Sequence, residues 1–190
     1  MTGLVLAIDT SIGTSVALVD EDGGRVSWSS DDPRGHAEAI GLAIESVLGA
    51  AGVGPEGVGA VAVGMGPGAY TGLRVGVAAA RAFAFARGLP LWPVPSHDAI
   101  REELGIPASR AVATPAGRRG HYVSVDGVTT LRHEPVDGLD GPLPVAEVAA
   151  AALVAVARRR LTAGEPTGPE QPLYLREPDI APPSRKRVTG

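Results

Sequence analysis

The segment from 64 to 76, which reads GMGPGAYTGLRVG, has the composition of a loop that binds an anion. It follows an apolar run at 61–63 and precedes a long helical pattern. Glycines in such a position let backbone N–H groups approach an anion at a helix N-terminus. No lysine follows the glycines, and their spacing differs from that of the dinucleotide-binding fingerprint. The segment therefore predicts a phosphate-type loop, containing Gly66 and Gly68, that lacks the usual positive charge.

Polar residues directly follow the first apolar run of the chain, at 4–8. They are Asp9, Thr10 and Ser11, and Thr14 with Ser15 completes a hydroxyl-rich turn. N–H and hydroxyl groups in such a turn can surround a phosphate, while the carboxylate orients a metal or a water molecule. The same residue types also satisfy the backbone of an ordinary turn, which is the commoner role. From this segment alone, both interpretations stay open.

Other catalytic groups have no arranged partners in the sequence. His36, His97, His121 and His133 lack the spacing of paired metal ligands, so we expect capping or solvent-exposed histidines and no metal site. No G-x-S-x-G segment is present, and the chain has no cysteine. The residues therefore predict neither a nucleophile nor a catalytic metal.

Composition places the chain among globular proteins. It has 190 residues, of which 44% are hydrophobic and 20% charged, with a formal net charge of −4. Such a charge gives no overall attraction for nucleic acid or for acidic lipid. The start of the chain lacks the pattern of a signal peptide, and the absence of cysteine agrees with a cytoplasmic location. Apolar segments are too short for a membrane span.

Hydrophobic periodicity predicts an α/β protein that opens with an antiparallel meander of three strands, with a hairpin turn at Asp22–Gly24. A helical stripe follows, then a strand, the glycine segment, a second helix and a further strand. Ser96 is expected to cap a short third helix. The predicted strands are 4–8, 15–19, 25–29, 61–63, 89–94, 110–113 and 122–125, and the predicted helices are 36–51, 71–87, 96–104 and 144–161.

The second predicted helix is unusually apolar. Arg74, Arg81 and Arg87 are its only charged residues, and small residues recur at every fourth position from Gly72 to Ala84. A helix that is apolar nearly all round must be covered on nearly all sides. We therefore expect it to contact a partner protein.

These segments together resemble the TsaB (YeaZ) family, which acts in the biosynthesis of threonylcarbamoyladenosine in tRNA and carries a glycoprotease-like label. The resemblance rests on LAIDTS at 6–11, TSVAL at 14–18, His36 and GPGAYTGLRVG at 66–76, with YLR at 174–176. It is strongest over the first hundred residues and weaker from 96 to 167. The TPAGRR segment at 114–119 stands where the family usually has an acidic element.

The resemblance implies a two-lobed actin/hexokinase/Hsp70-like (ASKHA) fold with RNase H-like lobes, the second of them reduced. Residues 1–95 would form the first lobe and 96–190 the second. It also implies a non-catalytic subunit that binds and activates TsaD, together with a TsaE-like ATPase, with tRNA held through the complex. The chain would form a homodimer when alone.

Partner contacts are expected on the two first-lobe helices, at Ile40, Ile44, Val47, Leu73, Gly76, Val77, Ala80 and Ala84. No cofactor is required, but a vestigial nucleotide site with weak ATP or ADP binding is expected at Asp9, Thr10, Ser11, Thr14, Gly66 and Gly68. Two alternatives stay open: a nucleotide-binding enzyme of the ASKHA type and a glycoprotease-like peptidase. Contacts of Arg118, Arg119 and the basic tail at 185–187 with tRNA are left open as well.

Overall fold

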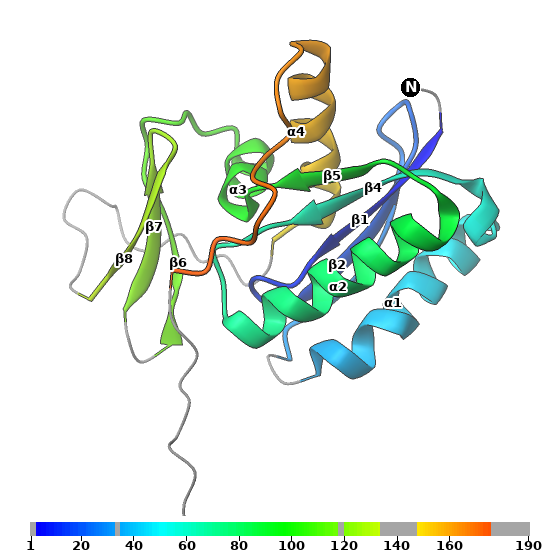
Figure 1. Cartoon of the computed structure of the whole chain (residues 1–190), viewed down its shortest axis with the longest axis horizontal. Helices are drawn as coiled ribbons and strands as arrows, with labels where there is room; N and C mark the ends of the chain where they lie inside the picture. The colour runs from blue at the N-terminus through cyan, green and yellow to red at the C-terminus, as the bar shows by residue number, and fades with distance from the viewer. Residues whose placement is uncertain (1–2, 33–34, 118–119, 134–147, 176–190) are drawn as a thin grey trace, which may run out of the picture.

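The fold is built on a five-stranded mixed sheet with helices on both of its faces (Figure 1). The computed structural model describes residues 3–32, 35–117, 120–133 and 148–175. Strand order in the sheet is β3-β2-β1-β4-β5. The strands are β1 (Leu4–Asp9), β2 (Thr14–Val19), β3 (Arg25–Ser30), β4 (Val58–Gly64) and β5 (Leu91–Val94).

The first three strands form an antiparallel meander, as predicted. β1 and β2 are almost wholly buried because both faces of the sheet are covered at the centre. β3 alternates between exposed and half-buried residues, the pattern of an edge strand. In the turn before it, the Asp20 carboxylate accepts a hydrogen bond from the Gly24 N–H at 2.7 Å. This confirms the predicted hairpin.

Two helices cross over between parallel strands on one face of the sheet. Helix α1 (His36–Ala51) and the short 3-10 helix η1 (Pro55–Gly57) connect β3 to β4, and α2 (Tyr70–Arg87) connects β4 to β5. β4 and β5 continue the sheet in parallel with β1, which requires such crossovers. Left-handed glycines, Gly52 and Gly88, end the two helices. Both predicted helices are confirmed.

The opposite face is covered by α4 (Ala150–Thr162), and α3 (Ser96–Leu104) packs against α4 and joins the same core. Of the helix predicted at 144–161, residues 144–147 lie outside the described residues and the helix itself begins at Ala150. α4 contacts β1, β2, β4 and β5. The last helix among the described residues therefore packs on the first sheet.

A second sheet contains β6 (Val112–Pro115), β7 (His121–Val125) and β8 (Val128–Arg132) in that order, all antiparallel. β8 is absent from the sequence-based expectation, and the turn before it is formed by Asp126 and Gly127. Both turn residues have positive φ, 47° and 77°, as a tight hairpin requires. The division of the chain at residue 95 stays a prediction.

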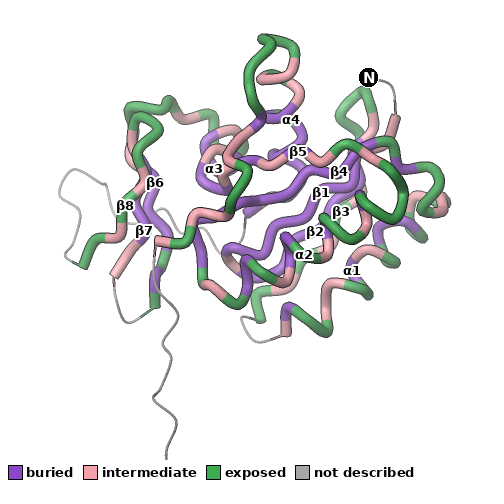
Figure 2. Tube along the Cα trace, in the orientation of Figure 1, coloured by how far each residue is buried: buried purple, intermediate pink, exposed green. Residues whose placement is uncertain are grey.

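The core has two layers, one on each face of the large sheet. Alternate residues of β1 supply them: Leu6 and Ile8 pack beneath α1 and α2, while Val5 and Ala7 pack beneath α4. Figure 2 shows the buried central strands between the helices. In the described ranges, no helix is both long and apolar enough to cross a membrane.

Candidate functional site

The candidate site lies where parallel strands end at one edge of the large sheet. β1 ends at Asp9, β4 leads to Gly66 and β5 leads to Ser96. The Ser96 hydroxyl donates to Asp9 Oδ2 at 2.6 Å and accepts from the Gly66 N–H at 3.0 Å. Asp9 Oδ1 accepts from the N–H and the hydroxyl of Ser11, at 2.8 and 2.6 Å. Both carboxylate oxygens are therefore engaged within the chain.

Asp9 is enclosed as well as hydrogen-bonded. Its exposed fraction is 1%. Burial raises the pKa of this carboxyl, and the hydrogen bonds from Ser11 and Ser96 offset only part of that effect. A metal ion or a nucleotide would have to open these contacts before it reached Asp9.

The glycine loop is pressed against the turn that follows β1. A Cβ on Gly68 would lie 2.7 Å from the Cα of Ser11, and a Cβ on Gly72 would lie 2.7 Å from the carbonyl oxygen of Thr10. The Thr10 hydroxyl donates to the Gly72 carbonyl at 2.7 Å. The loop glycines thus allow close approach of two backbone segments. The chain itself fills the space between loop and turn at these positions.

His36 joins the same region from the start of α1. Its Nδ1 lies 2.8 Å from the Thr14 hydroxyl, and its ring faces Gly72. Burial lowers the pKa of His36, while the charge of Asp32 raises it by less. The expectation of a capping or solvent-exposed histidine is wrong here, because the side chain is buried between the hairpin and α2.

All the residues expected in a nucleotide site gather at this one edge of the sheet. The hydroxyl or carboxylate of each polar member is paired within the chain, as described above for Asp9, Thr10, Ser11 and Thr14. Among the described residues, no group of three or more His, Asp or Glu side chains could hold a metal ion. Nucleotide binding stays a prediction.

Ser96 is the member of this edge that sequence reasoning assigned incorrectly. It is the first residue of α3, and no side chain caps that helix. Its hydroxyl instead bridges Asp9 and the glycine loop. The sequence did contain a signal for placing Ser96 beside Asp9. The carboxyl ends of parallel strands meet at one edge of a sheet, and Ser96 follows β5 as Asp9 follows β1.

The last described segment of the chain contacts the glycine loop and α2. The Leu173 N–H donates to the Met65 carbonyl at 2.8 Å. The Tyr174 ring lies 4.9 Å from the Tyr70 ring, centroid to centroid. Arg176, the last residue of the YLR element, lies outside the described residues, as do Arg118, Arg119 and the basic tail.

The residues expected at a partner interface lie mostly inside the chain. Ile40 and Ile44 are half-buried, and the other six are buried within the described fold: Val47, Leu73, Gly76, Val77, Ala80 and Ala84. The sheet and α1 cover this side of α2, since both helices lie on the same face. The apolar character of α2 is thus explained in large part without a partner.

A different set of apolar residues faces outward from the two helices. Leu42 on α1 is 63% exposed and Phe85 on α2 is 90% exposed. Val75 is half-buried on α2, and Ala78 and Ala82 are exposed there. We call these five residues the outer face; Figure 2 shows the outward turns of both helices as exposed or intermediate.

A second buried polar cluster joins α3 to the small sheet. His97 Nδ1 lies 2.6 Å from the Ser124 hydroxyl and Nε2 lies 2.8 Å from the Thr114 hydroxyl. Burial, and secondarily the charge of Arg101, lowers the pKa of His97 to about 3. The expectation of a capping or exposed histidine is wrong for this residue too, because it is 1% exposed. This enclosed Ser–His contact gives no access to a peptide substrate.

Comparison with known proteins identifies the family. Residues 30–161 match the family model described as TsaD: tRNA N6-adenosine threonylcarbamoyltransferase. The chain belongs to this family. An uncharacterized protein of Mycobacterium tuberculosis is 34% identical to it, over 94% of both chains. YeaZ from Pseudomonas aeruginosa superposes with a TM-score of 0.65 and 26% identity, covering 92% of this chain and 100% of that one. The chain is a YeaZ (TsaB) member of the family.

The relation to the transferases themselves covers only part of their length. A tRNA N6-adenosine threonylcarbamoyltransferase of Anaeromyxobacter dehalogenans is 40% identical over 46% of this chain, but the match spans 31% of the transferase. The α/β class is confirmed, and the large mixed sheet with a second small sheet matches the YeaZ-like fold of the ASKHA group. The TsaB (YeaZ) family therefore links this chain to threonylcarbamoyladenosine biosynthesis.

Proposed function

We propose that this TsaB-family chain is a non-catalytic subunit that binds and activates a TsaD-like transferase in the formation of threonylcarbamoyladenosine in tRNA. One observation carries the proposal. The polar edge around Asp9 is closed by the chain's own hydrogen bonds, whereas the outer face of α1 and α2 presents Leu42 and Phe85 to solvent. The outer face of the two helices is therefore more accessible to a partner protein than the polar edge is.

The outer face suits the packing of one helix pair on another. Its alanines allow close approach of a second helix, and Phe85 supplies a large side chain that a partner can bury. Glu38 and Glu45 are exposed on α1, and Arg74 and Arg81 are exposed on α2, where Arg81 also donates to the Glu170 carbonyl. A two-fold arrangement would place the acidic helix of one molecule against the basic helix of the other. The corresponding helices of the TsaD-like subunit are the proposed occupant.

The remaining subunits follow from the same proposal. A TsaE-like ATPase would join the complex, and tRNA would be held mainly by other subunits, because this chain has a formal net charge of −4. Without the TsaD-like subunit, the outer face would pair with that of a second copy. The complex would act in the cytoplasm.

A matched pair of variants tests the docking surface. Leu42→Glu places a charge in the outer face, and Val128→Glu places one on an equally exposed apolar residue of β8, with exposed fractions of 63% and 62%. We expect Leu42→Glu to weaken binding to the purified TsaD-like subunit at least about tenfold in calorimetry, the effect of roughly 1.4 kcal/mol. Val128→Glu should bind as the unaltered chain does. Equal binding by both variants would refute the assignment of the surface.

Reconstitution tests the role itself. The TsaD-like subunit is incubated with tRNA, threonylcarbamoyl donor and the TsaE-like ATPase, with and without this chain. Modification that requires the chain, and that Leu42→Glu abolishes, is the expected result. Modification of tRNA without the chain would contradict the activator role. Magnesium-dependent, tight ATP binding by the isolated chain would favour the ASKHA enzyme, and proteolysis lost on a single substitution would favour the peptidase.

Ala80→Glu is unsuitable as a test of partner binding, although Ala80 is one of the partner contacts expected from the sequence. Its side chain is fully buried against the sheet and α1. A carboxylate there would be an unpaired charge in the core. The variant would report on folding and not on the partner.

A further inference from the structure

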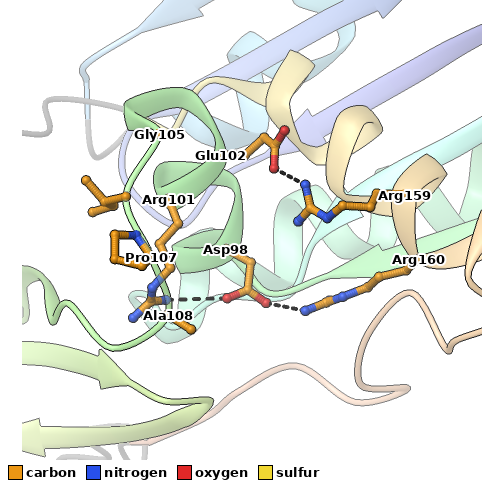
Figure 3. Close-up of a pocket in the computed structure, with 9 residues that line it drawn as sticks. Asp98, Arg101, Glu102, Gly105, Pro107, Ala108, Arg159 and Arg160 are labelled. Carbon is orange, nitrogen blue, oxygen red and sulfur yellow. Dashed lines mark hydrogen bonds and ion pairs between the residues drawn. The ribbon is translucent and has the colours of Figure 1, made fainter.

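A cavity of about 520 Å³ opens between α3, the loop that follows it and the last turns of α4 (Figure 3). α4 covers the face of the large sheet opposite α1 and α2, and α3 packs against α4, so the cavity is separate from the outer face. Three arginines and two carboxylates line it, together with a short apolar wall. The residues are Asp98, Arg101, Glu102, Gly105, Ile106, Pro107, Ala108, Arg159 and Arg160.

Arg101 contributes a deeply placed positive charge. Its exposed fraction is 7%, and burial lowers the pKa of its guanidinium. One terminal nitrogen donates to the carbonyls of Ser124 and Arg110, at 2.5 and 3.4 Å. The other lies 3.4 Å from Asp98 Oδ1, a long contact for an ion pair, and the buried Nε has no hydrogen-bond partner among the described residues. Asp98 and Asp126 both favour the charged form of Arg101, so what the described residues leave unsatisfied is its Nε–H and not its charge.

Arg159 and Arg160 approach the same cavity from α4. Arg160 donates to Asp98 Oδ2 at 2.7 Å, so Asp98 is shared between two guanidinium groups. Arg159 pairs with Glu102 and is 59% exposed, which leaves most of its donors available. Figure 3 shows Arg159 directed toward Glu102 and Arg160 directed toward Asp98, whereas Arg101 extends on the side of Pro107 and Ala108.

The interaction of positive charge with helix C-termini explains part of the arginine content of this cavity. Arginines in the last turn of α4 stabilise that helix end. Arg101 also lies in the last turn of its own helix, α3, but a helix end does not account for its burial or for an Nε that has no partner among the described residues. Among the described residues of the lining, arginines outnumber carboxylates by one, and the arginines come from two helices.

We propose that this cavity binds a phosphate group of a small molecule. A tetrahedral oxyanion can accept hydrogen bonds from several directions, which suits guanidinium groups on two helices. The apolar wall formed by Ile106, Pro107 and Ala108 would contact the uncharged part of the ligand. The inference is independent of the proposed function, since it concerns the opposite face of the sheet.

Two variants that break the same ion pair test the site. Arg159→Gln removes a donor to the ligand, and Glu102→Gln removes a competing negative charge. Pyrophosphate is titrated into each full-length protein at constant ionic strength, and binding is followed by the backbone amide signals of Gly105, Ile106 and Ala108. We expect saturable shifts, an affinity about tenfold weaker for Arg159→Gln, and a tighter affinity for Glu102→Gln.

The paired design separates binding from structural damage. Loss of the Arg159–Glu102 ion pair is common to both variants, so a purely structural effect would change the affinity in the same direction. Arg25→Gln, at an exposed arginine paired with Glu103, should leave the affinity unchanged. Shifts that do not saturate, affinity changes of the same sign, or malonate binding as tightly as pyrophosphate would each overturn the phosphate assignment.

Discussion

The buried imidazole of His97 should make the stability of the fold depend on pH. In the folded chain the ring is held between the hydroxyls of Ser124 and Thr114, and Arg101 lies close enough to oppose a second positive charge. Protonation would place a charge in this enclosed cluster without a carboxylate hydrogen-bonded to the ring. The folded state therefore keeps His97 neutral.

The size of the effect follows from the difference in pKa. The pKa of His97 is about 3 in the folded chain, against 6.5 for an ordinary histidine. Below pH 6.5 the unfolded chain takes up a proton that the folded chain does not, so the free energy of unfolding falls as pH falls. The slope is about 1.4 kcal/mol per pH unit, and the loss from pH 7 to pH 5 is about 2 kcal/mol. It continues until the pH approaches 3.

Urea denaturation at several pH values between 5 and 8 measures this slope. His97→Gln should be less stable at pH 7, by about 1–3 kcal/mol, because its amide cannot keep both hydrogen bonds in good geometry. It should also lose about 2 kcal/mol less than the unaltered chain between pH 7 and pH 5. Ser124→Ala is the control: it is also destabilised, but it retains the imidazole and hence the slope. The reasoning fails if His97→Gln and the unaltered chain show the same pH dependence.

Three further results are expected from single substitutions. Gly68→Ala should lower the free energy of unfolding by about 1–3 kcal/mol in urea denaturation, because its Cβ would lie 2.7 Å from the Cα of Ser11. Ser96→Ala should cost about 3 kcal/mol by the same measurement, since a buried oxygen of Asp9 and a backbone N–H lose their partner. Phe85→Ala should change the stability of the monomer by less than about 0.5 kcal/mol, as judged by thermal melting at low protein concentration, because the ring is 90% exposed.

Much of the large sheet could be predicted because its local signals agree. The apolar runs of β1 and β2 are separated by a polar turn, and Asp22–Gly24 lie where a hairpin is needed. The stripe of α1 repeats at helical spacing, and Gly52 ends it in the left-handed conformation that glycine favours. β8 lacked such a signal, since Thr129, Thr130 and Arg132 interrupt the apolar pattern on a strand at the edge of a small sheet.

Pairings between distant segments were harder to predict. Ser96 has the residue type and the position of an N-cap, but the sheet brings it to Asp9, 87 positions away in the chain. His97 looks solitary in sequence because its partners, Thr114 and Ser124, are hydroxyl residues on separate strands. Such side chains are too common for their spacing to carry a signal.

Helix α2 is apolar on nearly all sides, and hydrophobic periodicity alone could not predict what covers it. A hydrophobic pattern says that a face must be covered, but not whether the chain or a partner covers it. Here small residues at every fourth position, such as Gly76 and Ala80, bring the helix close to the turn after β1, to the sheet and to α1. What the described residues leave uncovered is the opposite side, where Phe85 projects. One side of α2 thus closes the polar edge around Asp9, and the other side presents an apolar surface. The close packing at the polar edge therefore also positions the surface that is proposed to bind a partner.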